Sequence, residues 1–345
     1  MKEVFIFLKL GSGNCLADYW LSYDNVLGFP AAVIYFGIPT AEDIKELYEY
    51  YNKIHDLRVK WKNEGKIKNK NNKKNNDYDY LIKNREQIVA FYGVYKEKGY
   101  FITVTPHKIY IYEAVDDIQN LEEDLFEEYN EDLNKRKIKK WKIEKNKETK
   151  TWNHIPKYMR VNIIKEIENR ESIPYILRSL HSNRGYNKKT CVKIVDKGII
   201  EAIKYAWLKI KAKPKNEIEL LELLSPIEFE TLIFLILTEA GLHVPAWRGA
   251  TLKDVDIIAK NLSSQEIKLT PVILKPGDVK SFQVKRKKDY NERVKNVDFV
   301  VTLSSERYLT ARWVIEQVKK YPRVKEWLKN SLWWVSEEAI IKLLE

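Results

Sequence analysis

LSPIEFETLIFLILTEAG, residues 224–241, is the first of three segments that decide the fold of the C-terminal part of this chain. It predicts a helix buried on almost every side, because a cap at Ser225 precedes a proline and a long apolar run. Glu230 interrupts that run, and its helical neighbours Ile227 and Phe234 place it on an apolar face. A carboxylate there is unfavourable unless it is paired or holds a metal ion, so Glu230 is a candidate site residue.

The other two segments predict a pair of strands. DVDIIA, residues 254–259, is a short apolar strand that opens with two aspartates two residues apart. SFQVKRKK, residues 281–288, predicts a second strand on which Gln283 and Lys285 share one face. If the two strands are neighbours, Asp256 converges with that pair.

These side chains suit the hydrolysis of a phosphodiester bond. Magnesium takes oxygen ligands, commonly one or two carboxylates completed by water and substrate phosphate. Asp256 and Gln283 are therefore the expected ligands of Mg²⁺, or of Mn²⁺ in its place. Lys285 would orient the attacking water and stabilise the developing charge, and Glu230 would add a contact from the helix. Alone, such residues more often mark a solvated strand end or a helix surface than a site.

The order of a helix glutamate, a strand aspartate and a strand Q-x-K pair resembles the PD-(D/E)xK nuclease superfamily. In detail it resembles the Mrr-like restriction endonucleases, which typically carry S-P-x-E-F-E and Q-x-K motifs. The residues that match these motifs are Phe229, Glu230, Asp256, Gln283 and Lys285. The resemblance covers residues 224–345, and it implies a restriction-endonuclease-like mixed sheet flanked by helices and a metal-dependent DNA endonuclease.

Two departures from the family pattern leave alternatives open. Asp254 stands where a glycine is usual, and the long gap before Gln283 holds a hairpin expected around residues 275–278. A catalytically weak or silent DNA-binding protein on the same fold is therefore one alternative. A nuclease that acts on RNA is another.

The composition favours a polyanionic partner. The 345 residues include 61 Lys and Arg against 49 Asp and Glu, which gives a formal net charge of +12. We expect double-stranded DNA as the partner, although a lysine-rich surface also serves solubility. Basic side chains flank the predicted site and are expected to bind phosphates on either side of the scissile bond, with solvated strand ends as the alternative. They are Lys280, Arg286, Lys287 and Lys288.

The cysteine content and the lengths of the apolar runs bear on the cellular location. Cys15 and Cys191 form no CxxC pair, so neither a zinc ribbon nor a disulfide framework is predicted. No apolar run reaches the roughly 20 residues that span a bilayer. We therefore expect a cytoplasmic protein without a membrane partner, and a double-strand cut, which needs two active sites, would favour a homodimer.

Residues 1–195 predict a strand-rich α+β domain, with one of its strands at residues 87–95 and a solvated basic loop at residues 58–76. Its start and the run GYFITVT (residues 99–105) resemble the PUA/EVE-type modules that precede some Mrr-like domains. In that superfamily such modules hold a flipped, modified base in an aromatic cage. The resemblance implies that this domain reads modified DNA. The candidate cage residues, each of which is otherwise explained as core or surface, are Trp20, Tyr35 and Trp141.

The remaining chain follows as a helix with a linker at residues 196–216 and then the nuclease domain at residues 217–345. After the predicted site, the pattern predicts a strand, a helix at residues 305–320, a strand at residues 331–335 and a closing helix. Strands that alternate with helices favour an α/β sandwich around a mixed sheet. The whole chain is therefore expected to be α/β, with an α+β N-terminal domain.

Overall fold

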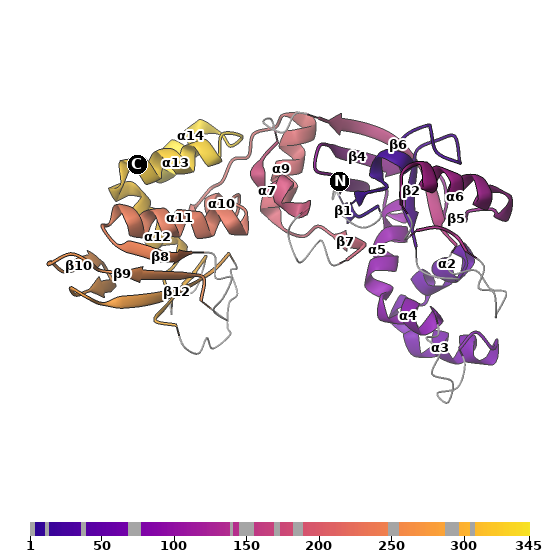
Figure 1. Cartoon of the computed structure of the whole chain (residues 1–345), viewed down its shortest axis with the longest axis horizontal. Helices are drawn as coiled ribbons and strands as arrows, with labels where there is room; N and C mark the ends of the chain where they lie inside the picture. The colour runs from indigo at the N-terminus through magenta and orange to yellow at the C-terminus, as the bar shows by residue number, and fades with distance from the viewer. Residues whose placement is uncertain are drawn as a thin grey trace. The chain divides into compact units, whose positions relative to one another are not determined.

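The computed structural model of the chain divides into two compact units (Figure 1). Unit 1 comprises Met1–Ile173 and Leu180–Val195, and unit 2 comprises Pro174–Ser179 and Asp196–Glu345. The residues that the structure describes are 4–10, 14–35, 39–67, 77–138, 141–144, 155–168, 173–181, 189–247, 255–286, 297–303 and 308–345. Both units combine helices with sheets, so the chain is mixed α/β.

Unit 1 is built on a seven-stranded mixed sheet. Its strands are β1 (Phe5–Leu8), β2 (Ala31–Ile34), β3 (Tyr100–Val104), β4 (Ile109–Ala114), β5 (Gln119–Asn120), β6 (Lys157–Ile167) and β7 (Cys191–Lys193). The order is β2-β6-β4-β3-β1-β7, and β5 pairs with β6. The pair β1–β3 is parallel, and the other described pairs are antiparallel.

In the sequence, five described helices of unit 1 precede β3 and one follows β4. They are α1 (Ala17–Trp20), α2 (Ala41–Glu49), α3 (Ile54–Asn63), α4 (Asp77–Lys83), α5 (Arg85–Lys96) and α6 (Phe126–Lys135), with 3-10 turns η2 (Tyr51–Lys53) and η3 (Glu123–Leu125). A capping box between Thr40 and Asp43 starts α2. Helices α2 and α5 pack together, and α5 also contacts β1 and β7.

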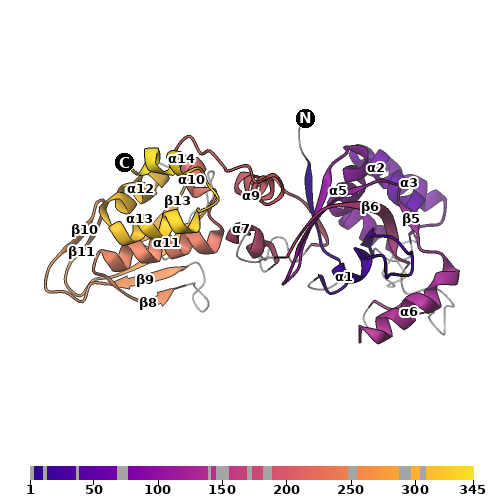
Figure 2. The same cartoon turned by 90° about the horizontal axis from the view of Figure 1, so that it is seen from above.

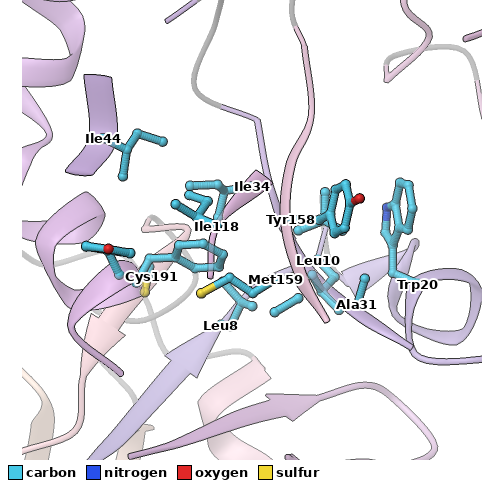
Figure 3. Packing of buried hydrophobic residues seen from close by; sticks show 14 of the residues in the cluster. Leu8, Leu10, Trp20, Ala31, Ile34, Ile44, Ile118, Tyr158, Met159 and Cys191 are labelled. Carbon is cyan, nitrogen blue, oxygen red and sulfur yellow. The ribbon is translucent and has the colours of Figure 1, made fainter. Parts of the chain in front are cut away.

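The core of unit 1 gathers side chains from the sheet and from the helices that cover it (Figure 3). Leu8, Ile34 and Met159 are fully buried on three strands, and Ile44 reaches the same core from α2. Apolar side chains at these positions hold the sheet and helix together because their burial removes them from water.

Two of the local predictions for unit 1 are wrong. The strand expected at residues 87–95 is the helix α5, whose buried residues Ile88, Phe91 and Tyr92 repeat at spacings of three and four. The basic loop expected at residues 58–76 is helical up to Asn63, because α3 buries Leu57 and Trp61 on one face. Residues 68–76 lie outside the described chain.

Unit 2 contains a four-stranded mixed sheet and a separate hairpin. Its strands are β8 (His243–Trp247), β9 (Ile257–Lys260), β10 (Ile267–Leu269), β11 (Val272–Leu274), β12 (Val279–Lys285) and β13 (Phe299–Thr302). The order of the sheet is β13-β12-β9-β8, in which β12 is antiparallel to β9 and parallel to β13. Strands β10 and β11 form the hairpin.

The helices of unit 2 are α7 (Tyr175–Arg178), α9 (Lys197–Leu208), α10 (Glu217–Leu221), α11 (Pro226–Glu239), α12 (Ala311–Lys320), α13 (Pro322–Ser331) and α14 (Glu337–Leu344); η5 (Ser179–His181) follows α7. Helix α11 lies against the sheet through β8 and β12 and packs on α12 and α13, as Figures 1 and 2 show. The predicted cap at Ser225 is confirmed, and it forms a capping box with Glu228. Among the described residues, no helix combines the length and apolar character needed to cross a bilayer.

Three local predictions for unit 2 need correction. The hairpin in the long gap is centred on Thr270 and Pro271, and residues 275–278 instead form the turn that leads into β12. The helix expected at residues 305–320 begins at Ala311, after the N-cap Thr310. In place of a strand at residues 331–335 there is the end of α13 and one bridge between Ala212 and Val335.

Candidate active site

Glu230 lies on α11, the helix that packs against the sheet of unit 2. It is half-buried, and so are its helical neighbours Ile227 and Phe234. The fully buried face of α11 is formed instead by residues such as Phe229 and Ile233. Glu230 is therefore less buried than the sequence predicts, and burial alone does not force this carboxylate to bind a metal ion.

Asp256 is fixed where β9 meets β12. Its backbone N–H donates to the carbonyl of Phe282 (2.9 Å). Its side-chain Oδ2 accepts a hydrogen bond from the backbone N–H of Val284 (2.7 Å) and contacts Lys285 Nζ at 3.2 Å. The structure thus brings Asp256 and Lys285 together across adjacent strands, as the spacing of the two motifs predicts.

Gln283 and Lys285 stand on one face of β12, two residues apart. In the parallel pairing with β13, Gln283 is opposite Val300 and Lys285 is opposite Thr302. Gln283 is only 3% exposed, whereas the side chains of Asp256 and Lys285 are 19% and 32% exposed. The charged pair therefore reaches solvent, and the amide lies further inside.

A second aspartate, which is not among the predicted residues, fixes the other neighbour of β12. Asp298 Oδ2 accepts hydrogen bonds from the backbone N–H and the hydroxyl of Ser281, both at 2.8 Å, and Oδ1 contacts Lys280 Nζ at 3.3 Å. Burial alone raises the pKa of Asp298, but the bonds from Ser281 and Lys280 outweigh it and hold this pKa below its usual value. A signal was present in the sequence, because Asp298 precedes the apolar strand β13 just as Asp256 precedes β9.

The predicted phosphate contacts differ in their surroundings. Lys280 is partly exposed and paired with Asp298. The Arg286 side chain is only 8% exposed, pairs with the carboxylate of Asp196 and donates to the carbonyl of Glu222. Arg286 is therefore directed into the protein, and its contact with DNA stays a prediction. Lys287 and Lys288, like Asp254, lie outside the described residues.

The donor set for a metal ion is small. Within the ranges that the structure describes, no three His, Cys, Asp or Glu side chains are grouped so that they could hold an ion. Asp256 and Gln283 offer one carboxylate and one amide oxygen at the site. This set fits a cation such as Mg²⁺ that takes most of its ligands from water and substrate phosphate, and it does not form a closed protein cage.

The three aromatic residues predicted to form a base pocket lie in one cluster of unit 1, which we call the aromatic cluster and which also includes Tyr129. Trp20 Nε1 donates to the hydroxyl of Tyr35 (2.7 Å), which is bonded to the hydroxyl of Tyr129 (2.9 Å). Tyr129 in turn donates to the backbone carbonyl of Trp141 (3.0 Å). Tyr129 is not among the predicted residues, although its spacing from Phe126 and Leu133 along α6 indicates a buried helix face.

The aromatic cluster is packed. Trp20 stacks on Tyr129 with ring centroids 5.5 Å apart, and both side chains are fully buried. The rings of Tyr35 and Trp141 are 4.8 Å apart. Burial raises the pKa of Tyr35 far above its usual value, because the charged phenolate would lose its hydration inside the protein. Trp20 and Tyr129 stack on each other, so a base could stack on Trp20 in place of Tyr129 only if the cluster rearranged.

No protein-family model, curated protein or solved structure matches this chain.

Proposed function

We propose that unit 2 is a Mg²⁺-dependent endonuclease that hydrolyses DNA phosphodiester bonds, in the manner of a restriction enzyme. The observation that carries this proposal is the contact between Lys285 Nζ and Asp256 Oδ2 (3.2 Å), with Gln283 on the same face of β12. The mixed sheet with α11 packed against it is compatible with the restriction-endonuclease-like fold that the motifs imply.

Asp256 and Lys285 would have different roles in the hydrolysis. The bonds from Val284 and Lys285 fix the orientation of the Asp256 carboxylate, so that it is ready to bind a cation without reorganisation. When bound, Mg²⁺ would polarise the phosphate and favour ionisation of a water molecule. Lys285 would then donate to a phosphate oxygen and stabilise the negative charge that develops in the transition state. The net charge of +12 favours the approach of the polyanion.

For unit 1 we propose a role in selecting DNA. The packed aromatic cluster gives no support to the narrower prediction of a modified-base pocket at Trp20, Tyr35 and Trp141. Two nuclease sites are needed for a double-strand cut, so a homodimer remains part of the proposal.

The direct test is cleavage of modified and unmodified plasmid DNA with Mg²⁺, comparing the wild type with Lys285→Ala. The matched control is Lys268→Ala, because Lys268 also lies on a strand and pairs with a carboxylate, that of Glu266, at 3.1 Å. We expect cleavage by the wild type and by the control, and its loss in Lys285→Ala. Equal cleavage by all three proteins would contradict the proposal.

Asp254 in place of a glycine and the long gap before Gln283 favour a second candidate, a DNA-binding protein that does not cleave. Calorimetric titration separates the two functions. A catalytic site predicts heat of Mg²⁺ or Mn²⁺ binding that Asp256→Ala removes, whereas a silent site predicts unchanged DNA affinity and no metal-dependent heat. Parallel assays on duplex DNA, single-stranded DNA and RNA test RNA as the substrate.

A further inference from the structure

We propose that Arg286 is a positioning residue for the Lys285 site, a role that rests on the proposed nuclease function, and that it acts through Asp196. The starting observation is the direction of its side chain. Although Arg286 belongs to the basic run that follows the Q-x-K pair, its side chain is only 8% exposed. A buried guanidinium requires partners, because an unpaired charge in the interior is strongly unfavourable.

The partners of Arg286 come from the ends of two helices. Its guanidinium pairs with the carboxylate of Asp196 and donates to the backbone carbonyl of Glu222. Asp196 is the N-cap of α9, and its other oxygen accepts from the backbone N–H of Ile199 (3.2 Å). Glu222 is the residue that follows α10. One side chain therefore joins the start of α9 and the end of α10 to β12.

The packing around these contacts is close. A Cβ atom at Gly198 would lie 2.0 Å from the carbonyl oxygen of Glu222, so only glycine allows α9 to approach α10 in this way. The start of α11 is also near. Burial raises the pKa of Glu228, in its capping box, above the usual value, and the charge of Arg286 acts in the opposite direction. Arg286 thus lies where the ends of three helices meet.

This arrangement bears on Lys285 because the two residues are adjacent at the end of β12. Lys285 is the last residue of the strand and pairs with Thr302 of β13. Side chains alternate along a strand, so Arg286 points away from the face that carries Gln283 and Lys285. The guanidinium contacts fix the backbone beyond the last strand pair. They thereby limit the positions that the Lys285 ammonium reaches.

Asp196 also lies at the junction between the units. The backbone N–H of Ile194, in unit 1, donates to the carbonyl of Phe5 (2.9 Å). Asp196 is the first residue of unit 2 after this point, and only Val195, which is 76% exposed, stands between them. The N-cap of α9 is therefore only two residues along the chain from Ile194.

The test compares Arg286→Gln, Arg286→Lys and Asp196→Asn in the full chain. Arg312→Gln is the matched control, because Arg312 forms an exposed ion pair with Glu316 in the same unit. We expect Arg286→Gln to lower kcat on the order of 100-fold while KM for DNA and its salt dependence stay within about twofold. Arg286→Lys should recover part of the loss, since an ammonium keeps the charge but not the planar fork. Asp196→Asn keeps the helix cap and removes only the charge, so its loss should be smaller than that of Arg286→Gln.

The opposite pattern would overturn the proposal. A phosphate contact predicts that Arg286→Gln raises KM, reduces the slope of log affinity against log salt by about one, and leaves kcat unchanged at saturating DNA. Equal rates for Arg286→Gln and Arg312→Gln would overturn it as well.

Hydrogen exchange at the backbone amide of Val284 gives a readout that does not depend on cleavage. This amide donates to Asp256 Oδ2, so its protection reports on the geometry of the site. We expect faster exchange there in Arg286→Gln and in Asp196→Asn, and wild-type exchange in Arg312→Gln. If the wild type does not cleave, the nuclease proposal fails, and the exchange data still decide whether Arg286 fixes β12. Wild-type protection in folded Arg286→Gln, judged by circular dichroism, would overturn the positioning role.

Discussion

The aromatic cluster of unit 1 and the Asp256–Lys285 pair of unit 2 both bring together side chains singled out from the sequence, but their polar atoms face different surroundings. In the aromatic cluster, the hydroxyl of Tyr35 joins Trp20 and Tyr129 inside the protein. In unit 2, Asp256 and Lys285 keep 19% and 32% of their side chains exposed.

This difference in exposure indicates that the aromatic cluster is part of a core and that the Asp256–Lys285 pair is a candidate site. Buried polar groups that satisfy one another stabilise a single arrangement and leave little for a ligand to bind. Charged groups that contact each other and still reach solvent can exchange that contact for a substrate without breaking the core. The comparison therefore predicts that substitutions in the aromatic cluster affect stability and that those in the Asp256–Lys285 pair affect activity.

The largest effect is expected from Lys285→Ala. We expect cleavage to fall by about 1,000-fold, because one preorganised donor to the developing charge is lost. The apparent melting temperature should stay close to that of Lys268→Ala, since Lys285 is partly exposed. Plasmid nicking rates and thermal denaturation measure both quantities. A large loss of stability with no change in cleavage rate would show that Lys285 is a structural residue. The predicted difference between the aromatic cluster and the Asp256–Lys285 pair would then be wrong.

Trp20→Ala is the corresponding substitution in unit 1. Because Trp20 is fully buried and stacks on Tyr129, its truncation should reduce the free energy of unfolding by about 3–5 kcal/mol. Denaturant unfolding followed by tryptophan fluorescence measures the change. A stable Trp20→Ala protein that loses only its preference for modified DNA would reinstate the base pocket.

A smaller change in the same cluster is Tyr35→Phe. The substitution removes the acceptor of Trp20 Nε1 and one partner of the Tyr129 hydroxyl, while the ring contact with Trp141 is kept. We expect a loss of about 2 kcal/mol in unfolding free energy, since a buried donor is left without its partner. A neutral result in chemical denaturation would show that the cluster is more loosely packed than its hydrogen bonds indicate.

The smallest effect concerns pH and an ion pair in unit 1 in which Asp43 is buried and Lys66 is partly exposed. Asp43 is bonded to Lys66 Nζ (2.8 Å) and to the backbone N–H of Thr40 (2.7 Å). Although burial alone raises the pKa of Asp43, these bonds hold it below its usual value. Its charged form therefore contributes stability above the unfolded pKa of about 3.9, and this contribution is lost as the pH falls through the lower folded pKa.

Asp43→Asn should consequently cost about 1 kcal/mol at pH 7 and progressively less below pH 4, because the wild type is then protonated as well. Urea denaturation at several pH values measures the difference. Glu42→Gln is the control, since its carboxylate is exposed on the same helix and pairs with Lys45. A penalty for Asp43→Asn that is the same at pH 3 and pH 7 would exclude the charge as its cause.

In unit 2, short sequence patterns such as capping residues and strand alternation predicted local structure correctly. Ser225, Pro226 and Glu228 specify the start of α11 through capping alone. The contact between Asp256 and Lys285 followed from the two-residue period of neighbouring strands. The burial and pairing of the Arg286 side chain could not be predicted in this way. Its partner Asp196 lies 90 residues away in the chain, and only the tertiary packing brings the two together.

In unit 1, apolar content alone predicts a strand where the structure has a helix. Residues 87–95 are rich in β-branched and aromatic side chains, yet their helical spacing places Ile88, Phe91 and Tyr92 on one buried face. Residue type alone, which favours Trp20, Tyr35 and Trp141, does not show whether a ring faces a cavity or another ring. Tyr129, which fills the space beside Trp20, comes from a distant helix.

The chain passes between the units more than once, and this limits how either unit could be recombined with a different partner domain. It leaves unit 1 after Ile173, returns after Ser179 and leaves again after Val195, so Pro174–Ser179 belongs to unit 2 although β7 of unit 1 follows it. Helix α7, in this short segment, packs on α9. A fragment that begins at Asp196 therefore loses a piece of its own core. A single recombination point in the gene would therefore leave one unit without part of its chain. Joining either unit to a new domain would require two recombination points, or a new segment that replaces α7.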